Sequence, residues 1–159
     1  MTPEQLSALK ADIAADPAFA SIPHTADGAY AIAAVYSQQA SPAFIVWKTS
    51  VDPDEIMRNG MDWTRVDNLT VGKARIWDWM TKLGAFDASK INIRAGIDAA
   101  WVGTAADLAV RAIVYTHCKR PALRIEKLFA SGTGTDASPA TMTHEGSISY
   151  QDVQSAWNN

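Results

Sequence analysis

The sequence lacks the paired cysteines, long apolar runs and strong net charge that mark several classes of protein. Its single cysteine, Cys118, excludes an intramolecular disulfide and favours a reducing compartment. No stretch approaches the roughly 18 apolar residues of a membrane-spanning helix, and the first residues predict no signal peptide. The net charge of −3 argues against a dedicated nucleic-acid-binding protein. We therefore expect a soluble protein, with neither a membrane nor a specific nucleic acid as its partner.

Recognisable catalytic and metal-binding motifs are also missing. The three histidines, His24, His117 and His144, lie outside any HExxH pattern, and the sequence has no CxxC or GxSxG motif. Cys118 has basic neighbours that could activate a thiol, but a cysteine within a predicted helix is more often a small core residue. We therefore expect no catalytic residue, no metal and no cofactor. An enzyme that uses Cys118 or His144 in an unrecognised site is the alternative.

What the sequence does contain is enough apolar material for a core. Of 159 residues, 48% are apolar and 19% are charged, which is typical of a globular protein. A chain of this length folds without disulfides or metals and suggests a single domain. Six tryptophans are many for this length, and we expect four or five of them to fill the core.

Helix starts are marked by a capping side chain and a residue that closes a capping box. These pairs are Thr2 with Gln5, Asp52 with Glu55, Thr104 with Asp107, and Ser149 with Asp152. Apolar periodicity predicts helices over residues 2–16, 26–38, 52–59, 70–83, 88–101 and 105–130, followed by a short one ending at 157. Pro121 should kink or split the longest of these. The fold class is mostly α: a bundle of about five or six helices with a C-terminal extended arm or short β segment.

Three other segments have less regular patterns. Residues 43–51 favour a short strand or an extended buried crossing, and Trp63 lies in a predicted loop. The helix over 70–83 is expected to bury one face, formed by Ile76, Trp79, Met80 and Leu83, with Trp77 beside it. Basic residues cluster at Lys119, Arg120, Arg124 and Lys127. They are expected on a solvated face or helix end, or alternatively against an acidic patch of a neighbouring subunit.

The C-terminal segment predicts a boundary between residues 1–130, the helical body, and residues 131–159, a hinge and arm. Small residues dominate 131–140, a weak strand or extended stretch follows, and a short helix ends at Trp157. Ordering such an arm costs about 1–2 kcal/mol of backbone entropy per residue. A partner could supply that free energy by seating Tyr150, Val153 and Trp157 in a groove. The alternative is that the arm folds back onto its own helices.

Several stretches of the sequence resemble small proteins encoded by tailed bacteriophages. They are LRIEKLFASGTG at 123–134, SPATM at 138–142, EG at 145–146 and YQDV at 150–153, with MTPEQL at 1–6 and FIVWK at 44–48. The size and helical makeup are similar to those of head–tail connector, or neck adaptor, proteins, although the chain is longer than the compact adaptors.

This resemblance implies a structural protein of the virion neck, made in the host bacterial cytoplasm. It implies a ring homo-oligomer that docks on the portal protein through C-terminal segments and contacts other neck or tail proteins, with DNA passing through the ring. A tail-completion or assembly factor that leaves the finished particle is the alternative. The aromatic and apolar residues expected to bind partners are Trp47, Trp63, Tyr150, Val153 and Trp157.

Overall fold

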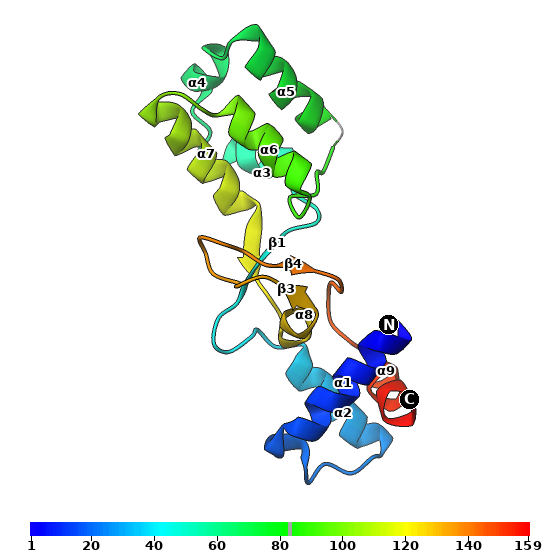
Figure 1. Cartoon of the computed structure of the whole chain (residues 1–159). Helices are drawn as coiled ribbons and strands as arrows, with labels where there is room; N and C mark the ends of the chain where they lie inside the picture. The colour runs from blue at the N-terminus through cyan, green and yellow to red at the C-terminus, as the bar shows by residue number, and fades with distance from the viewer. Residues whose placement is uncertain (83) are drawn as a thin grey trace. The chain divides into compact units, whose positions relative to one another are not determined.

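The computed structural model describes residues 1–82 and 84–159, and this part of the chain is mostly helical (Figure 1). It forms two compact units. Unit 1 combines Met1–Val46 with Pro121–Asn159, and unit 2 is Trp47–Arg120. The predicted fold class, mostly α with a short β segment towards the C-terminus, is confirmed. The division differs from the expected boundary between 130 and 131, because residues 121–159 group with the N-terminal helices.

Unit 1 is built from both ends of the chain. Its elements are α1 (Pro3–Ala15), a 3-10 turn η1 (Pro17–Phe19), α2 (Ala26–Tyr36), most of β1 (Ile45–Trp47), α8 (Arg124–Leu128), β3 (Ala130–Ser131), β4 (Thr141–Met142) and α9 (Tyr150–Asn158). Strands β3 and β4 pair antiparallel, with Ala130 opposite Met142. Capping boxes begin α1 and α9, as predicted at Thr2 and Ser149.

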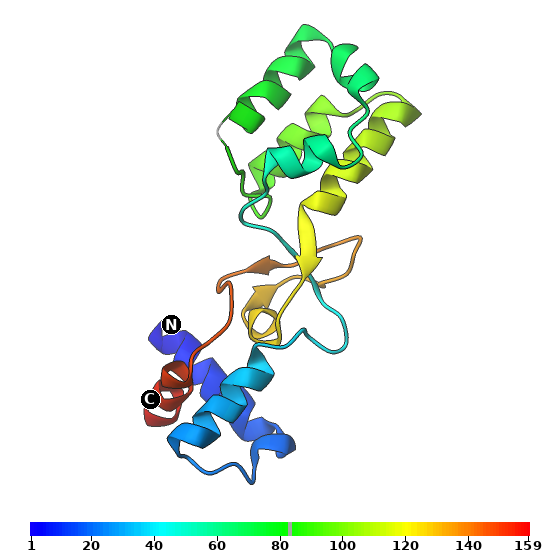
Figure 2. The ribbon, with the colours of Figure 1, turned by 180° about the vertical axis from the view of Figure 1, so that it is seen from behind.

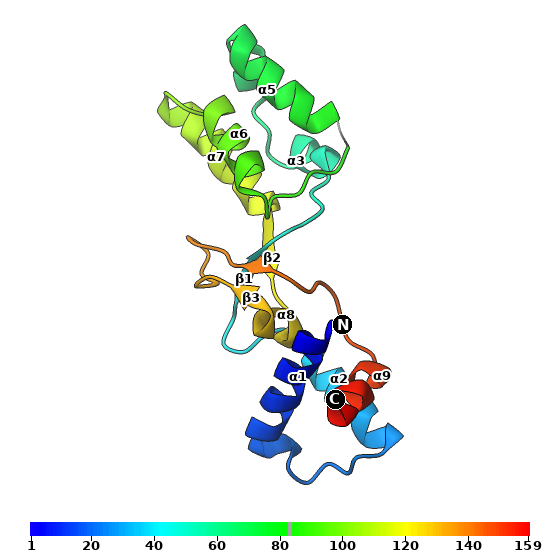
Figure 3. The same ribbon diagram turned by 45° about the vertical axis from the view of Figure 1, so that its right-hand side comes forward.

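The C-terminal helix α9 is part of the core of unit 1. It packs against α1 and α2, and Val153 and Ala156 are fully buried among apolar side chains of those helices. At the end of the chain, the amide of Asn159 donates a hydrogen bond to Ser7 Oγ at 2.7 Å, so the two termini lie side by side (Figure 3). The arm therefore folds back onto its own helices, which is the alternative reading of the sequence.

The segment that leads to α9 is held by a buried carboxylate. Glu126, in α8, has no exposed surface. Its two oxygens accept hydrogen bonds at 2.8 Å from the backbone N–H of Leu123 and from that of Gly146. A buried carboxylate is stable only when such donors replace its water. This one fastens the C-terminal segment to the start of α8.

Part of the predicted hinge is also packed against the rest of unit 1. Gly134 has a φ of +64° and is buried, and a Cβ at this position would lie 2.1 Å from the Phe44 ring. Its carbonyl accepts a hydrogen bond of 2.7 Å from Ile45 N–H. Only glycine fits this conformation at such close approach.

Unit 2 is a cluster of short helices. It contains α3 (Pro53–Arg58), α4 (Trp63–Asp67), α5 (Val71–Lys82), α6 (Ile91–Ala100), α7 (Ala105–His117) and most of β2 (Lys119–Pro121). Helices α5 and α6 lie side by side (Figure 2). In the core, the rings of Trp77 and Trp101 meet edge to face, with centroids 5.3 Å apart. Such aromatic pairs stabilise a core beyond the area that they bury.

One predicted element of this region is wrong and another is right only in part. The predicted loop at Trp63 is helix α4, which Asp62 caps by accepting hydrogen bonds from the N–H groups of Thr64 and Arg65. The helix predicted over 105–130 is split at Pro121, as expected, into α7 and α8, but strand β2 lies between them. In the middle of the predicted helix, backbone hydrogen bonds with residues far away in the sequence replace the helical ones. The predicted position of Leu83 in the 70–83 helix lies outside the described residues.

The chain passes from unit 1 to unit 2 within β1 and returns to unit 1 within β2. In unit 1, Ala122 N–H donates to Phe44 O at 2.8 Å, and in unit 2, Lys48 N–H donates to Cys118 O at 2.8 Å. The predicted short strand at 43–51 is thus confirmed. These hydrogen bonds explain why the helix stops at α7, because Cys118 and Ala122 use backbone groups with Lys48 and Phe44.

The tryptophans are less buried than expected. Only Trp77 and Trp101 are buried among the six, Trp47 and Trp157 are partly buried, and Trp63 and Trp79 are exposed. Fewer tryptophans are therefore buried than the four or five expected: Trp63 on α4 and Trp79 on α5 are exposed, and Trp47 and Trp157 only pack against the edges of the two cores.

The burial of Val153 gives a first testable prediction. Replacing Val153 with Asp places an unpaired charge in the core of unit 1, and we expect a loss of roughly 3–5 kcal/mol in the free energy of unfolding. Ser155→Asp, at an exposed position of α9, should change that free energy by less than about 0.5 kcal/mol. Urea unfolding followed by circular dichroism measures both. Equal stabilities of the two variants would show that α9 does not belong to the core.

Candidate functional site

Three of the residues expected to bind partners lie on α9, and each contacts unit 1 itself. Val153 is a core residue. The Tyr150 ring stacks on that of Tyr30, with centroids 4.2 Å apart, and the Trp157 ring stacks on that of His24 at 4.3 Å. Tyr150 and Trp157 keep part of their surface exposed. Of the three, they alone remain available to a partner.

The other two expected residues belong to unit 2. The Trp47 ring lies 5.6 Å from that of Tyr115, and the Arg94 guanidinium lies 4.8 Å above it, so Trp47 is partly buried within the unit. Trp63, in contrast, is 59% exposed at the start of α4. An exposed tryptophan is uncommon on a monomer and typical of interface centres. Trp63 is therefore the expected residue best placed to bind a partner.

Next in sequence, helix α5 has an exposed apolar surface that the sequence did not predict. Val71 is 74% exposed and Trp79 is 66% exposed. They flank a groove of about 410 Å³. We call this surface the α5 outer face; it is formed by Val71, Ala74, Arg75, Asp78, Trp79 and Lys82. The expected face is right for Met80, which is buried, and for Ile76, which packs against the core, but it is wrong for Trp79. Trp77, expected beside this face, is instead the tryptophan of α5 that packs on Trp101.

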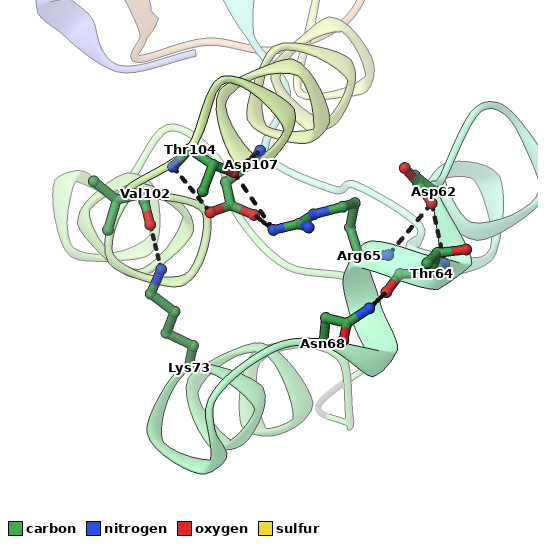
Figure 4. Close-up of polar contacts among 8 residues, drawn as sticks. All are labelled: Asp62, Thr64, Arg65, Asn68, Lys73, Val102, Thr104 and Asp107. Atoms are coloured by element: carbon green, nitrogen blue, oxygen red, sulfur yellow. Dashed lines mark hydrogen bonds and ion pairs between the residues drawn. The ribbon is translucent and has the colours of Figure 1, made fainter.

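Helix α4, which carries Trp63, is fixed to α7 by a short ion pair (Figure 4). The Arg65 guanidinium lies 2.6 Å from the Asp107 carboxylate, which is almost fully buried. Asp107 also accepts a hydrogen bond from Thr104 N–H and thereby closes the capping box of α7. The Arg65 hydrogen bond, together with that from Thr104, lowers the pKa of Asp107 to about 2. A carboxylate held in this way fixes the start of α7 against α4.

Helix α5 is fixed near its N-terminus by a second polar contact. The Lys73 ammonium donates a hydrogen bond to the backbone carbonyl of Val102, just before α7 (Figure 4). Together with the Trp77–Trp101 pair, this contact sets the rotation of α5 about its axis. Because Trp77 packs inward on Trp101, Trp79 lies on the outer side of α5 and is exposed.

Unit 1 contains a polar pocket of about 610 Å³. Its wall includes Asp12, Asp16, Gln38, Arg124 and Lys127. The Arg124 guanidinium lies 2.6 Å from the Asp16 carboxylate and 3.5 Å from that of Asp12. Arg124 was expected on a solvated face or a helix end, and it is instead partly buried in an ion-pair network.

Asp16 in this pocket and Tyr36, which binds the pocket residue Asp12, are stabilised in fixed charge states. Burial, with a hydrogen bond of 2.5 Å to Asp12, raises the pKa of Tyr36 well above its ordinary value. The Arg124 hydrogen bond lowers the pKa of Asp16. At neutral pH Tyr36 therefore stays protonated and Asp16 stays ionised. A general acid or base works best with a pKa near the working pH, so these two groups fit a structural role.

The two residues named for an enzymatic alternative belong to different units. Burial raises the pKa of the Cys118 thiol in unit 2 to about 12, so it is protonated at neutral pH. In unit 1, the His144 ring meets Phe129 edge to face, with centroids 5.8 Å apart. Within residues 1–82 and 84–159, no cluster of three or more His, Cys, Asp or Glu is arranged to hold a metal ion. In the same residues, no helix has the length and apolar character needed to cross a membrane.

Comparison with known proteins adds no relative: the chain matches no protein family, no curated protein and no solved structure.

The Arg65–Asp107 pair predicts how stability depends on pH. Asp107 has a lowered pKa in the folded state, so its contribution is present above the unfolded pKa of about 3.9 and is lost as the pH falls through about 2. We expect Asp107→Asn to be less stable than the wild type at pH 7, and the difference to shrink between pH 4 and pH 2. Urea unfolding across this range measures it. Asp67→Asn, at an exposed position, is the control, and a pH-independent difference for Asp107→Asn would contradict the prediction.

The Cys118 environment predicts an unreactive thiol. A pKa raised from 9.0 to about 12 lowers the thiolate fraction at pH 8 roughly a thousandfold. We therefore expect native protein to react with a thiol reagent far more slowly than urea-unfolded protein. A native rate within tenfold of the unfolded rate would contradict this prediction and would favour an accessible, activated cysteine.

Proposed function

We propose that this protein is a structural component of a tailed-bacteriophage virion: a head–tail connector subunit that forms a ring between the portal and the tail. Its partners would be further copies of itself, the portal protein and other neck or tail proteins, with DNA passing through the ring. Support comes from two sources. One is the resemblance of residues 1–6, 44–48 and 123–153 to small phage proteins. The other is the exposed aromatic surface of unit 2.

The observation that carries the proposal is the exposure of two tryptophans on consecutive helices. Trp63 on α4 and Trp79 on α5 each leave more than half of their side chain in water. Indole side chains bury about 150–250 Å² when covered, so covering both would contribute strongly to an interface. The rigid positions of α4 and α5, set by Arg65–Asp107 and Trp77–Trp101, present these rings without a large loss of conformational entropy on binding.

The C-terminal helix α9 was expected to be an arm that docks on a partner, but in this proposal it is a structural part of unit 1. Because Val153 belongs to the core, α9 supplies the rigid base of unit 1 and is not a free arm that docks on the portal. Partner contacts in unit 1 would instead use the exposed sides of Tyr150 and Trp157, which lie on surfaces already ordered by Tyr30 and His24.

Quantitative mass spectrometry of purified particles tests the proposal. We expect the protein in the particles at a fixed copy number, comparable to that of other neck proteins. In a phage that carries Trp63→Ser with Trp79→Ser, the protein should still fold, and heads and tails should accumulate unjoined. Leu108→Ser, which also removes an exposed apolar side chain, should leave assembly intact.

Two other outcomes would contradict the proposal in different ways. A protein needed for assembly but absent from finished particles would be an assembly or tail-completion factor. Normal particles from the double tryptophan variant would show that this surface has no part in assembly.

A further inference from the structure

The two units carry formal charges of opposite sign. Unit 1 has three Lys and Arg against eight Asp and Glu, a charge of −5. Unit 2 has eleven Lys and Arg against nine Asp and Glu, a charge of +2. Between separate copies of the chain, unit 1 of one copy therefore attracts unit 2 of another, whereas like units repel each other.

On unit 2, exposed apolar and basic groups occur together on the α5 outer face. Arg75 is exposed between Val71 and Trp79, and it takes part in no ion pair among the described residues. The ammonium of Lys82 lies 3.7 Å from the Asp78 carboxylate, and both side chains are largely exposed. An exposed pair of this kind is weak, so Arg75 is the charge on this face that is free to meet a carboxylate.

On unit 1, exposed aromatic and acidic groups occur together on α2. We call Asp27, Tyr30 and Tyr150 the α2 patch. Tyr30 is 55% exposed, and its ring is held by the stack on Tyr150. Asp27 is three residues before Tyr30, so both side chains lie on one side of α2. Asp27 is exposed and forms no ion pair with any residue that the structure describes.

We propose that the α5 outer face of one copy binds the α2 patch of a second copy of this chain. Arg75 meets the Asp27 carboxylate, and Trp79 covers the exposed side of the Tyr30–Tyr150 stack. Arginine, tryptophan and tyrosine are enriched among the residues that dominate interface energetics, and a guanidinium forms strong charge-assisted hydrogen bonds with a carboxylate. This inference names a partner for the surface in the proposed function and rests on that surface being a protein-binding one.

The charges favour this contact over a symmetric one. If two α5 outer faces met each other, the unpaired charge on both sides would be an Arg75 guanidinium, and two α2 patches would each bring only an Asp27 carboxylate, so neither symmetric contact pairs opposite unpaired charges. Joining different surfaces brings the two opposite charges together and leaves a complex of two copies with one free α5 outer face and one free α2 patch. Repeated head to tail from copy to copy, such a contact is heterologous and extends to a ring or a filament.

Sedimentation velocity of the purified full-length protein, over a concentration series, tests the inference. We expect wild type to form oligomers larger than a dimer. Arg75→Asp and Asp27→Arg should each weaken association roughly tenfold or more, because each creates a like-charge contact. Leu108→Ser is the control and should associate like wild type. Circular dichroism checks that each variant is folded, and all three substitutions lie at exposed positions.

An equimolar mixture of the two charge variants gives the sharpest result. In the mixture, the carboxylate introduced by Arg75→Asp meets the guanidinium that Asp27→Arg introduces on the other variant. The unchanged Arg75 of the second variant meets the unchanged Asp27 of the first, so every contact between the two variants is attractive again. We expect the mixture, and the chain that carries both substitutions, to recover association. Two outcomes would overturn the inference: a wild type that stays monomeric at every concentration, or association that Asp27→Arg leaves unchanged, as a face-to-face contact would.

The solution experiment is separate from the test of the virion role. In one outcome, the protein forms oligomers that depend on Arg75 and Asp27 and yet is absent from particles. That result would contradict the proposed function but support this contact. A protein present in particles, whose self-association ignores both charge variants, would contradict this contact alone.

Discussion

Arg124 joins the two chain segments from which unit 1 is made. Its guanidinium lies 2.6 Å from the Asp16 carboxylate, 108 residues earlier, and 4.6 Å above the Tyr36 ring, while its backbone N–H donates to Gln38 O at 2.8 Å. A partly buried guanidinium is stable there because carboxylates and an aromatic face replace its water. Once α8 is fastened in this way, Glu126 of the same helix holds the segment that leads to α9. The position of α9, and with it the stack of Tyr150 on Tyr30, therefore depends on Arg124 and Glu126.

The sequence predicted the elements that are set by local interactions. Capping boxes at Thr2, Thr104 and Ser149 begin helices as expected, because cap and partner are three residues apart. The failures are non-local. Residues 118–122 were predicted to be helical, yet Cys118 and Ala122 form backbone hydrogen bonds with Lys48 and Phe44. Helix α4 is too short to show an apolar period. The joining of 1–46 with 121–159 depends on contacts such as that of Arg124 with Asp16. These residues are 108 positions apart, so no local spacing in the sequence predicts the contact.

The candidate binding surfaces were found only in part for a related reason. Trp63 was expected to bind a partner, and the structure shows its side chain exposed; the binding itself stays a prediction. Trp79 was assigned to the core and Trp77 to its margin, since both fit an apolar period on α5. The contact of Trp77 with Trp101 decides which of the two is buried. It depends on the packing of α5 beside α6, which the apolar spacing within one helix cannot predict. The same limit applies to Val153. Its apolar spacing on α9 was correct, but spacing alone does not distinguish a helix that seats in its own core from one that seats in a partner.

Building unit 1 from both ends of the chain has a consequence for synthesis on the ribosome. The first 46 residues leave the exit tunnel long before α8 and α9 exist, because the 74 residues of unit 2 are translated between them. At about 5–20 residues per second, that interval is roughly 4–15 s. Unit 2, a continuous stretch, can complete its core during this time. The nascent α1 and α2 meanwhile expose the apolar sides of Leu9, Ile32 and Tyr36, which makes them natural clients for a chaperone.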